Sequence, residues 1–205
     1  MQTMGAMNVR ELNEKYKDYV GIDEVARGNF FGPSIFVGVK VKRDSEEFLK
    51  ESKESDFSWA MDSKKTSKVQ RAELFKRIEP LVEYHLVEIP PEKIDSSGLS
   101  FSIKEALEEI MERFQGEKFL YDGKATFGVN SPDLETLVKA DDKVFSVSCA
   151  SIIAKHFLDL KMQEFHDRYP DYGFLSHAGY ATKKHIQAVK DYGYLPEHRK
   201  SYKIK

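Results

Sequence analysis

Hydrophobic residues in this 205-residue chain form two kinds of segment, short apolar runs and longer stretches with helical spacing. A short run of apolar or β-branched residues is typical of a buried strand. The strands predicted on this basis cover residues 19–23, 34–41, 84–89 and 118–121. The first two runs flank the sequence RGNFFGP, whose Gly and Pro residues indicate a turn, so we expect a hairpin to open the sheet.

Helices are expected where apolar residues recur at every third or fourth position, because these residues then share one face. This spacing predicts helices at 68–78 (Val69, Leu74 and Ile78), 102–114 (Ile103, Leu107, Ile110 and Phe114), 150–169 (Ile153, Phe157 and Leu160) and 183–192, with a further one near the C-terminus. The segment Val144–Val147 fits either another strand or a lead-in to the long helix. The mixed order of strands and helices favours an α/β fold, with a mixed β-sheet flanked by helices in a single domain over residues 1–205.

Charge is balanced over the whole chain but not along it. With 34 acidic and 32 basic residues, the formal net charge of -2 does not indicate a polyanionic ligand. The segment 176–205, which we expect to be a basic C-terminal helical segment, is different: its basic residues are Lys183, Lys184, Lys190, Arg199, Lys200, Lys203 and Lys205, and its acidic ones are Asp191 and Glu197. Such a segment is compatible with binding a phosphate backbone, although a basic tail is more often solvated surface.

Cysteine content and hydropathy restrict the setting. The single cysteine, Cys149, excludes an internal disulfide and a cysteine-rich zinc site, and its apolar context SCASIIAK predicts a packed thiol rather than a nucleophile. The N-terminal sequence lacks the apolar core of a signal peptide, and no segment approaches the ~20 apolar residues that a membrane span needs. We therefore expect a cytoplasmic protein with no membrane partner.

Acidic residues recur where predicted strands end. Asp23 and Glu24 follow the first strand, Asp122 follows the strand at 118–121, and Asp141 and Asp142 precede the long helix. Strand ends are where α/β folds expose functional side chains, and carboxylates gathered there repel one another unless cations lie between them. Mg²⁺ prefers such oxygen ligands and binds well between carboxylates and a substrate phosphate. Each acid taken alone could equally be a turn or cap residue, because Asp favours both.

The sequence around these acids resembles the type 2 ribonucleases H, the group of ribonuclease HII and its relative ribonuclease HIII. The matching blocks, in the family's order, are GIDEVARGNFFGP (21–33), MDSKK (61–65), LYDG (120–123), KADDKVFSVSCASIIAK (139–155), YPDYGFLSHAGYATKKH (169–185) and HRKSY (198–202). Together they span nearly the whole chain from Tyr19 onward. The resemblance implies a ribonuclease H fold and hydrolysis of RNA within RNA–DNA hybrids or of ribonucleotides in duplex DNA, leaving 5′-phosphate and 3′-hydroxyl ends.

The resemblance also implies a metal site. The family's four catalytic acids, which hold two divalent ions (Mg²⁺ or Mn²⁺), correspond to Asp23, Glu24, Asp122 and Asp141. The family usually has Lys-Gly-Asp at the last acid, so Lys139-Ala140-Asp141 makes Asp141 the match. Asp142 would then be a neighbour, or a cap for the helix that follows.

Substrate contacts implied by the resemblance lie in three motifs. Ala26-Arg27-Gly28 replaces the family's Gly-Arg-Gly, whose backbone contacts the ribose 2′-hydroxyl, and Ala178-Gly179-Tyr180 places Tyr180 at the sugar of the scissile step. Ser63 and Lys64 match a phosphate-contacting Asp-Ser-Lys, and we add Lys183 as a phosphate contact from the basic segment. Outside a family context, Arg27 could form a surface salt bridge and Tyr180 could be a half-buried aromatic.

The Ala at position 26 is a departure from the family's Gly. Gly serves where a backbone approaches a ligand closely or adopts positive φ, and Ala adds a β-carbon that penalises both. If this methyl group faces the sugar, it should narrow the pocket and favour runs of ribonucleotides over a single one.

Several alternatives remain open. A ribonuclease HIII-like specificity is suggested by NFFGP and Lys139-Ala140, whereas Arg27 and the lack of room before Tyr19 for an N-terminal substrate-binding domain favour ribonuclease HII. A catalytically silent hybrid-binding module or a phosphoesterase of free nucleotides would be a different class. No Gly-x-Ser-x-Gly elbow supports a Ser–His–Asp triad, and the histidines show no zinc-like spacing. We expect a monomer whose partner is a nucleic acid duplex.

Overall fold

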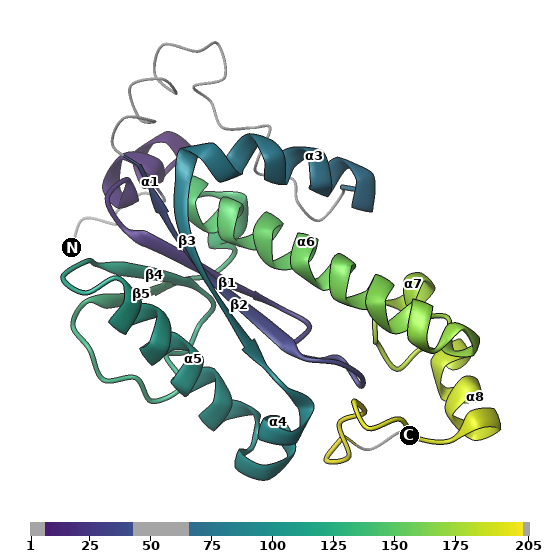
Figure 1. The fold of residues 1–205 in the computed structure, drawn as a ribbon. Coiled ribbons are helices and arrows are strands. Elements are labelled where there is room, and N and C mark those ends of the chain that lie inside the picture. Colours follow the sequence, from purple (N-terminus) through teal and green to yellow (C-terminus); the bar gives the residue numbers. More distant parts are fainter. Residues whose placement is uncertain (1–6, 43–65, 203–205) are drawn as a thin grey trace.

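The computed structural model describes residues 7–42 and 66–202, which form a five-stranded sheet covered by helices (Figure 1). The strands are β1 (Val20–Val25), β2 (Ser34–Val41), β3 (Val82–Ile89), β4 (Phe119–Asp122) and β5 (Leu134–Leu137). They lie in the order β3-β2-β1-β4-β5. β1 is antiparallel to β2, and β2 is antiparallel to β3, whereas β1, β4 and β5 are parallel. The predicted mixed sheet and opening hairpin are therefore confirmed.

Helices cover both faces of the sheet (Figure 1). They are α1 (Val9–Tyr16), α3 (Lys68–Ile78), α4 (Pro91–Ser97), α5 (Leu99–Arg113), α6 (Phe145–Arg168), α7 (Phe174–His177) and α8 (Lys183–Tyr192). α6 packs on β1 and β2 with α3 against it, and α4 and α5 lie on the opposite face. α7 and α8 follow at the far end of α6, close to the C-terminal segment (Figure 1).

The central strands are apolar on both faces because both faces are covered. In β2, Ile35, Val37 and Val39 belong to the core beneath α6, whereas Phe36 belongs to the core beneath α5. In β1, a Cβ at Gly21 would lie 2.4 Å from backbone atoms at the start of α6. Glycine at this position therefore lets α6 approach β1 closely enough to bring the helix start against the strand.

Several helix predictions are confirmed and others need correction. The predicted face of α5 is buried, and α8 has the predicted bounds. Val69 and Leu160, expected on buried faces, are instead 74% and 48% exposed. No helix forms in residues 193–202, so the described part of the C-terminal segment contains α7, α8 and a non-helical stretch of chain.

The segment Val144–Val147 is not a strand, because α6 begins at Phe145. The first ten residues of this helix are all buried, so their hydrophobic pattern does not separate helix from strand. Asp142 is not the cap of α6. Instead Asn13 of α1 accepts a hydrogen bond from the Phe145 N–H (2.8 Å) and donates one to the Lys143 carbonyl (2.7 Å).

α1, α4, α7 and β5 were not predicted, since they are short and their apolar residues are few. Within residues 7–42 and 66–202, no helix is long and apolar enough to cross a membrane.

Candidate functional site

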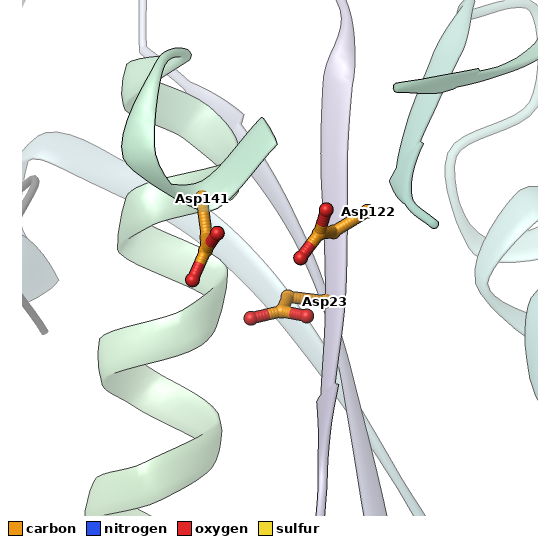
Figure 2. A group of neighbouring side chains, drawn as sticks. All are labelled: Asp23, Asp122 and Asp141. Carbon is orange, nitrogen blue, oxygen red and sulfur yellow. The ribbon is translucent and has the colours of Figure 1, made fainter. Parts of the chain in front are cut away.

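Three carboxylates from separate segments meet beside the start of α6 (Figure 2). Asp23 lies in β1 and Asp122 ends the neighbouring parallel strand β4. Asp141 belongs to the short 3-10 helix Ala140–Asp142 that precedes α6. One carboxylate oxygen of each lies within 4.8 Å of those of the other two. Figure 2 shows the side chains of Asp23 and Asp122 directed from the sheet toward that of Asp141.

Local hydrogen bonds hold this geometry. The Ala140 N–H donates to Asp122 Oδ1 (2.9 Å), which ties the loop carrying Asp141 to the end of β4. The Ser148 hydroxyl donates to the Asp141 carbonyl, which anchors the same loop to the first turn of α6. Lys139 adopts a left-handed conformation (φ 56°) that turns the chain into this loop. Asp141 is therefore placed by contacts to both the sheet and the helix.

Burial makes the cluster electrostatically costly. It raises the pKa of Asp23 to about 7, with the nearby Glu24 and Asp122 acting in the same direction. The positive charge of Lys155 and a hydrogen bond from Ser151 oppose this rise in the Asp23 pKa. Lys155 also donates to the Ser151 hydroxyl one turn earlier in α6. These two α6 residues were not singled out from the sequence, although they lie in the matching block SCASIIAK.

Glu24 does not join the three aspartates. Successive side chains of a strand point to opposite faces, so Asp23 faces α6 and Glu24 faces the other side, beside Tyr121. Glu24 Oε1 accepts a hydrogen bond from Arg27 Nη1 (2.8 Å), and the Glu24 N–H donates to Asp23 Oδ1 (2.8 Å). Burial raises the Glu24 pKa, which the Tyr121 hydroxyl and Arg27 lower. Glu24 Oε2 is buried and has no hydrogen-bond partner among the described residues.

The donor set fits a hard divalent cation. All three converging groups offer carboxylate oxygens, and two of them, Asp23 and Asp141, are buried. Carboxylates buried this close together repel unless protonated or neutralised by a cation. Asp142, in contrast, is exposed and lies outside the three-carboxylate cluster.

The two predicted sugar-contacting motifs lie against each other. The Gly179 carbonyl accepts from the N–H groups of Phe30 (3.0 Å) and Phe31 (3.1 Å), and the buried Asn29 amide donates to the Ala178 carbonyl (2.5 Å). A Cβ at Gly179 would lie 2.5 Å from the Phe31 carbonyl oxygen, so only glycine allows this approach. The loop after β1 and the loop after α7 thus form one surface. Asn29, which makes the contact, was not predicted.

Ala26 corrects one expectation and confirms another. Its φ of 64° is the left-handed conformation that favours glycine, as the family's Gly suggested. Its side chain, however, is buried in the hydrophobic core beneath α6 rather than exposed toward a ligand. The methyl group therefore does not narrow a substrate pocket.

The remaining predicted substrate residues have different placements. Arg27, Gly28, Tyr180 and Lys183 are exposed, with Tyr180 at 49%. Ser63 and Lys64 lie outside the described residues, as do Lys203 and Lys205. Arg199, counted with the basic C-terminal residues, is fully buried and adds nothing to a solvent-facing charged surface.

Three histidines form a buried group beneath this surface. His177 stacks on His185 with ring centroids 4.4 Å apart, and His185 Nε2 lies 3.2 Å from His198 Nε2. His185 Nδ1 contacts the Tyr180 carbonyl (2.9 Å), so the pair supports the tyrosine's backbone. Burial lowers the pKa of both His185 and His198 to about 4. Cys149 is buried, and burial raises its thiol pKa, as expected for a packed thiol.

The mixed sheet and the carboxylates beside its central parallel strands define an α/β protein of the ribonuclease H type. The family profile of ribonuclease HII matches residues 20–205. A ribonuclease HII from Sulfurovum sp. (strain NBC37-1) is 37% identical over 194 residues, which cover 95% of this chain and 96% of that protein. The chain belongs to the ribonuclease HII family, and it is a ribonuclease H-type hydrolase.

Solved structures show the same fold. Ribonuclease HII in the PCNA:RNase HII complex from Archaeoglobus fulgidus superposes with a TM-score of 0.72 at 24% identity, covering 89% of this chain and 92% of that one. Bst ribonuclease HIII in complex with Mn²⁺ superposes with a TM-score of 0.64 at 15% identity. The match covers 94% of this chain but only 68% of the ribonuclease HIII chain.

Proposed function

We propose that this protein cuts the RNA strand of RNA–DNA hybrids and ribonucleotides embedded in duplex DNA, with Asp23, Glu24, Asp122 and Asp141 holding two divalent cations, Mg²⁺ or Mn²⁺. The observation that carries the proposal is the convergence of three carboxylates beside the exposed backbone of Arg27 and Gly28. Products would have 5′-phosphate and 3′-hydroxyl ends. The chemistry that the cations supply when bound is activation of a water and neutralisation of charge on the phosphate and the leaving oxygen.

The chain's own residues position and balance this site. Asp23 lies between the other two aspartates, and the buried carboxylates preorganise the negative charge that attracts cations. Glu24 is included as the fourth acid because its N–H holds Asp23 and its buried Oε2 has no protein partner within the described residues. Lys155, whose charge acts on Asp23, limits repulsion in the absence of cations.

Substrate recognition would use the surface formed by the two loops. We assign the backbone of Ala26-Arg27-Gly28 to the ribose and Tyr180 to the sugar at the scissile step, since Arg27, Gly28 and Tyr180 are exposed on the loops that pack against each other. Lys183, at the exposed start of α8, would contact a phosphate. Ser63 and Lys64 are proposed phosphate contacts from the resemblance alone. Residues 1–205 would act as one catalytic domain, with 176–205 as its substrate-binding segment, in a cytoplasmic monomer.

A ribonuclease HIII-like preference for runs of ribonucleotides is the alternative. The buried Ala26 methyl removes the steric argument for it, so we favour cleavage at single ribonucleotides as well as in hybrids.

The test is a cleavage panel with titrated Mg²⁺ and Mn²⁺ on three duplexes of one sequence: an RNA–DNA hybrid, a DNA duplex with one ribonucleotide, and plain DNA. We expect cleavage of the first two and none of the third, with 5′-phosphate ends. Binding of the hybrid without cleavage would support a silent binding module, and hydrolysis of free nucleotides alone would support a phosphoesterase. Cleavage confined to ribonucleotide runs would support the HIII-like alternative.

A further inference from the structure

Arg199 is a charged side chain that the fold encloses completely (0% exposed). A guanidinium offers five N–H donors in a rigid fork, and all five are used here. Nε donates to the Gly32 carbonyl (3.0 Å), Nη1 to the Arg27 carbonyl (2.8 Å) and the Tyr202 hydroxyl (3.2 Å), and Nη2 to the Ala26 carbonyl (2.8 Å) and the Ser34 hydroxyl (3.1 Å). None of these acceptors is a carboxylate, so backbone dipoles of the loop after β1 balance the buried charge.

These bonds determine which way two peptide groups face. In a trans peptide the carbonyl of one residue and the N–H of the next point in opposite directions, and no peptide bond in the described residues is cis. The Ala26 carbonyl points to Arg199, so the Arg27 N–H points away from it. The Arg27 carbonyl points to Arg199 and to the Tyr202 hydroxyl (2.8 Å), so the Gly28 N–H also points away.

Away from Arg199 means toward solvent. Arg199 is buried, whereas Arg27 and Gly28 are both exposed. Neither N–H has a hydrogen-bond partner within residues 7–42 and 66–202. Two consecutive backbone donors therefore face outward, at the motif assigned to the ribose, and they are set by a residue more than 170 positions later in the chain.

We propose that Arg199 is a positioning residue for ribose recognition: its fork on the Ala26 and Arg27 carbonyls holds the Arg27 and Gly28 N–H groups in the orientation that accepts a ribose hydroxyl oxygen. The proposal rests on the proposed function, in that the motif contacts the sugar. Arg199 itself touches no substrate. Lysine at this position keeps the charge but cannot reach both carbonyls with fixed geometry, so charge alone does not replace the fork.

The chain offers a control that separates the fork from general anchoring of the C-terminal segment. Asp95 of α4 binds the same segment from the other side, accepting from the N–H groups of Lys200 (2.8 Å) and Ser201 (2.9 Å). Its hydrogen bonds go to this segment rather than to the loop after β1, and it belongs to neither proposed substrate motif. Asp95→Ala should therefore loosen the segment while leaving the two outward N–H groups to Arg199.

The experiment measures hydroxyl discrimination in the metal-loaded enzyme. The substrate is a DNA duplex with one ribonucleotide, and the competitor is the same duplex entirely of DNA, which differs by one hydroxyl. The ratio of the competitor's inhibition constant to the substrate's KM reports how strongly the enzyme prefers the hydroxyl. We expect Arg199→Lys to lower this ratio about tenfold, the value of one hydrogen bond removed, with the DNA inhibition constant unchanged. Asp95→Ala should keep the wild-type ratio.

Three results would overturn the proposal: a wild-type ratio near one, a wild-type ratio in folded Arg199→Lys, or an equal fall in Asp95→Ala. If Arg199→Lys does not fold, as judged by circular dichroism, Tyr202→Phe decides, because it removes only the second donor to the Arg27 carbonyl. A lowered ratio in Tyr202→Phe supports the proposal, and an unchanged one rejects it. Wild-type protein that cleaves neither hybrid nor ribonucleotide-containing duplex would instead refute the proposed function.

Discussion

Replacing Asp23 with asparagine should destroy activity and, in the absence of metal, make the protein more stable. The pKa of Asp23 is raised from 3.8 to about 7 by burial. Between these values the native protein holds a proton that the unfolded chain has released, so stability falls as pH rises through this window. At about 1.4 kcal/mol per pKa unit, ionised Asp23 costs the metal-free protein at most about 4 kcal/mol at pH 8.

Asparagine has nearly the same shape and no charge, so Asp23→Asn removes this cost. Water entry and side-chain rearrangement relieve part of it in the wild type, and we therefore expect a gain of about 2–4 kcal/mol at pH 8. For a chain of this size, that corresponds to a Tm higher by about 4–16 °C. At pH 4.5 the gain should shrink to about 1 kcal/mol, because wild-type Asp23 is then protonated in the native state.

The assay is thermal unfolding followed by circular dichroism, with chelator, at both pH values. Adding Mg²⁺ or Mn²⁺ should then raise the wild-type Tm by mass action and leave the variant nearly unchanged. Asp142→Asn is the matched control, since it makes the same change of charge at an exposed neighbouring acid. It should keep wild-type cleavage and shift stability by no more than about 0.5 kcal/mol.

The reasoning is refuted if Asp23→Asn lowers the metal-free Tm at pH 8, or if it retains near-normal cleavage at saturating metal. A complete loss of cleavage in Asp142→Asn together with an active Asp141→Asn would show that the wrong neighbour was assigned to the site.

Three further predictions concern other parts of the molecule. Neutralising Lys183 and Lys184 to glutamine should reduce the log–log salt slope of hybrid binding by about 0.9 for each phosphate that is no longer neutralised, taking B-DNA as the guide, and an unchanged slope would mean that both are only solvated. Ala26→Gly should leave stability within about 1 kcal/mol, because relief of the left-handed alanine offsets the removal of a buried methyl and a more flexible unfolded chain. It should also leave the preference between single and multiple ribonucleotides unchanged, and a shift of more than a few-fold would place the methyl at the substrate. The pKa of His185 and His198, lowered to about 4, means that the unfolded chain binds protons first as pH falls below about 6.5, so urea unfolding should show a loss of about 2 kcal/mol per histidine at pH 5. An NMR titration showing either imidazole charged at pH 6 would contradict this.

Local chemistry was legible in the sequence alone. Short apolar runs identified β2 and the hairpin, because strand length and turn residues are set by neighbouring positions. Asp23 and Asp122 were singled out because each stands at the end of an apolar run, a property of a few consecutive residues. That they meet was an inference from family resemblance. The parallel pairing of β1 with β4 is what places them side by side.

Tertiary structure decided what depends on residues distant in the chain. Alternation along β1 separates Glu24 from Asp23, and packing of α6 against Gly21 brings Asp141 to the cluster. Arg199 appeared in the sequence as one more basic residue of a charged tail, yet it is buried, because the loop after β1 offers it three carbonyls that no local pattern reveals. A side chain's charge is a property of its sequence position, but its partners are set by which segments the sheet and helices bring together. Long-range packing therefore determined the orientation of the loop, and with it the two outward N–H groups.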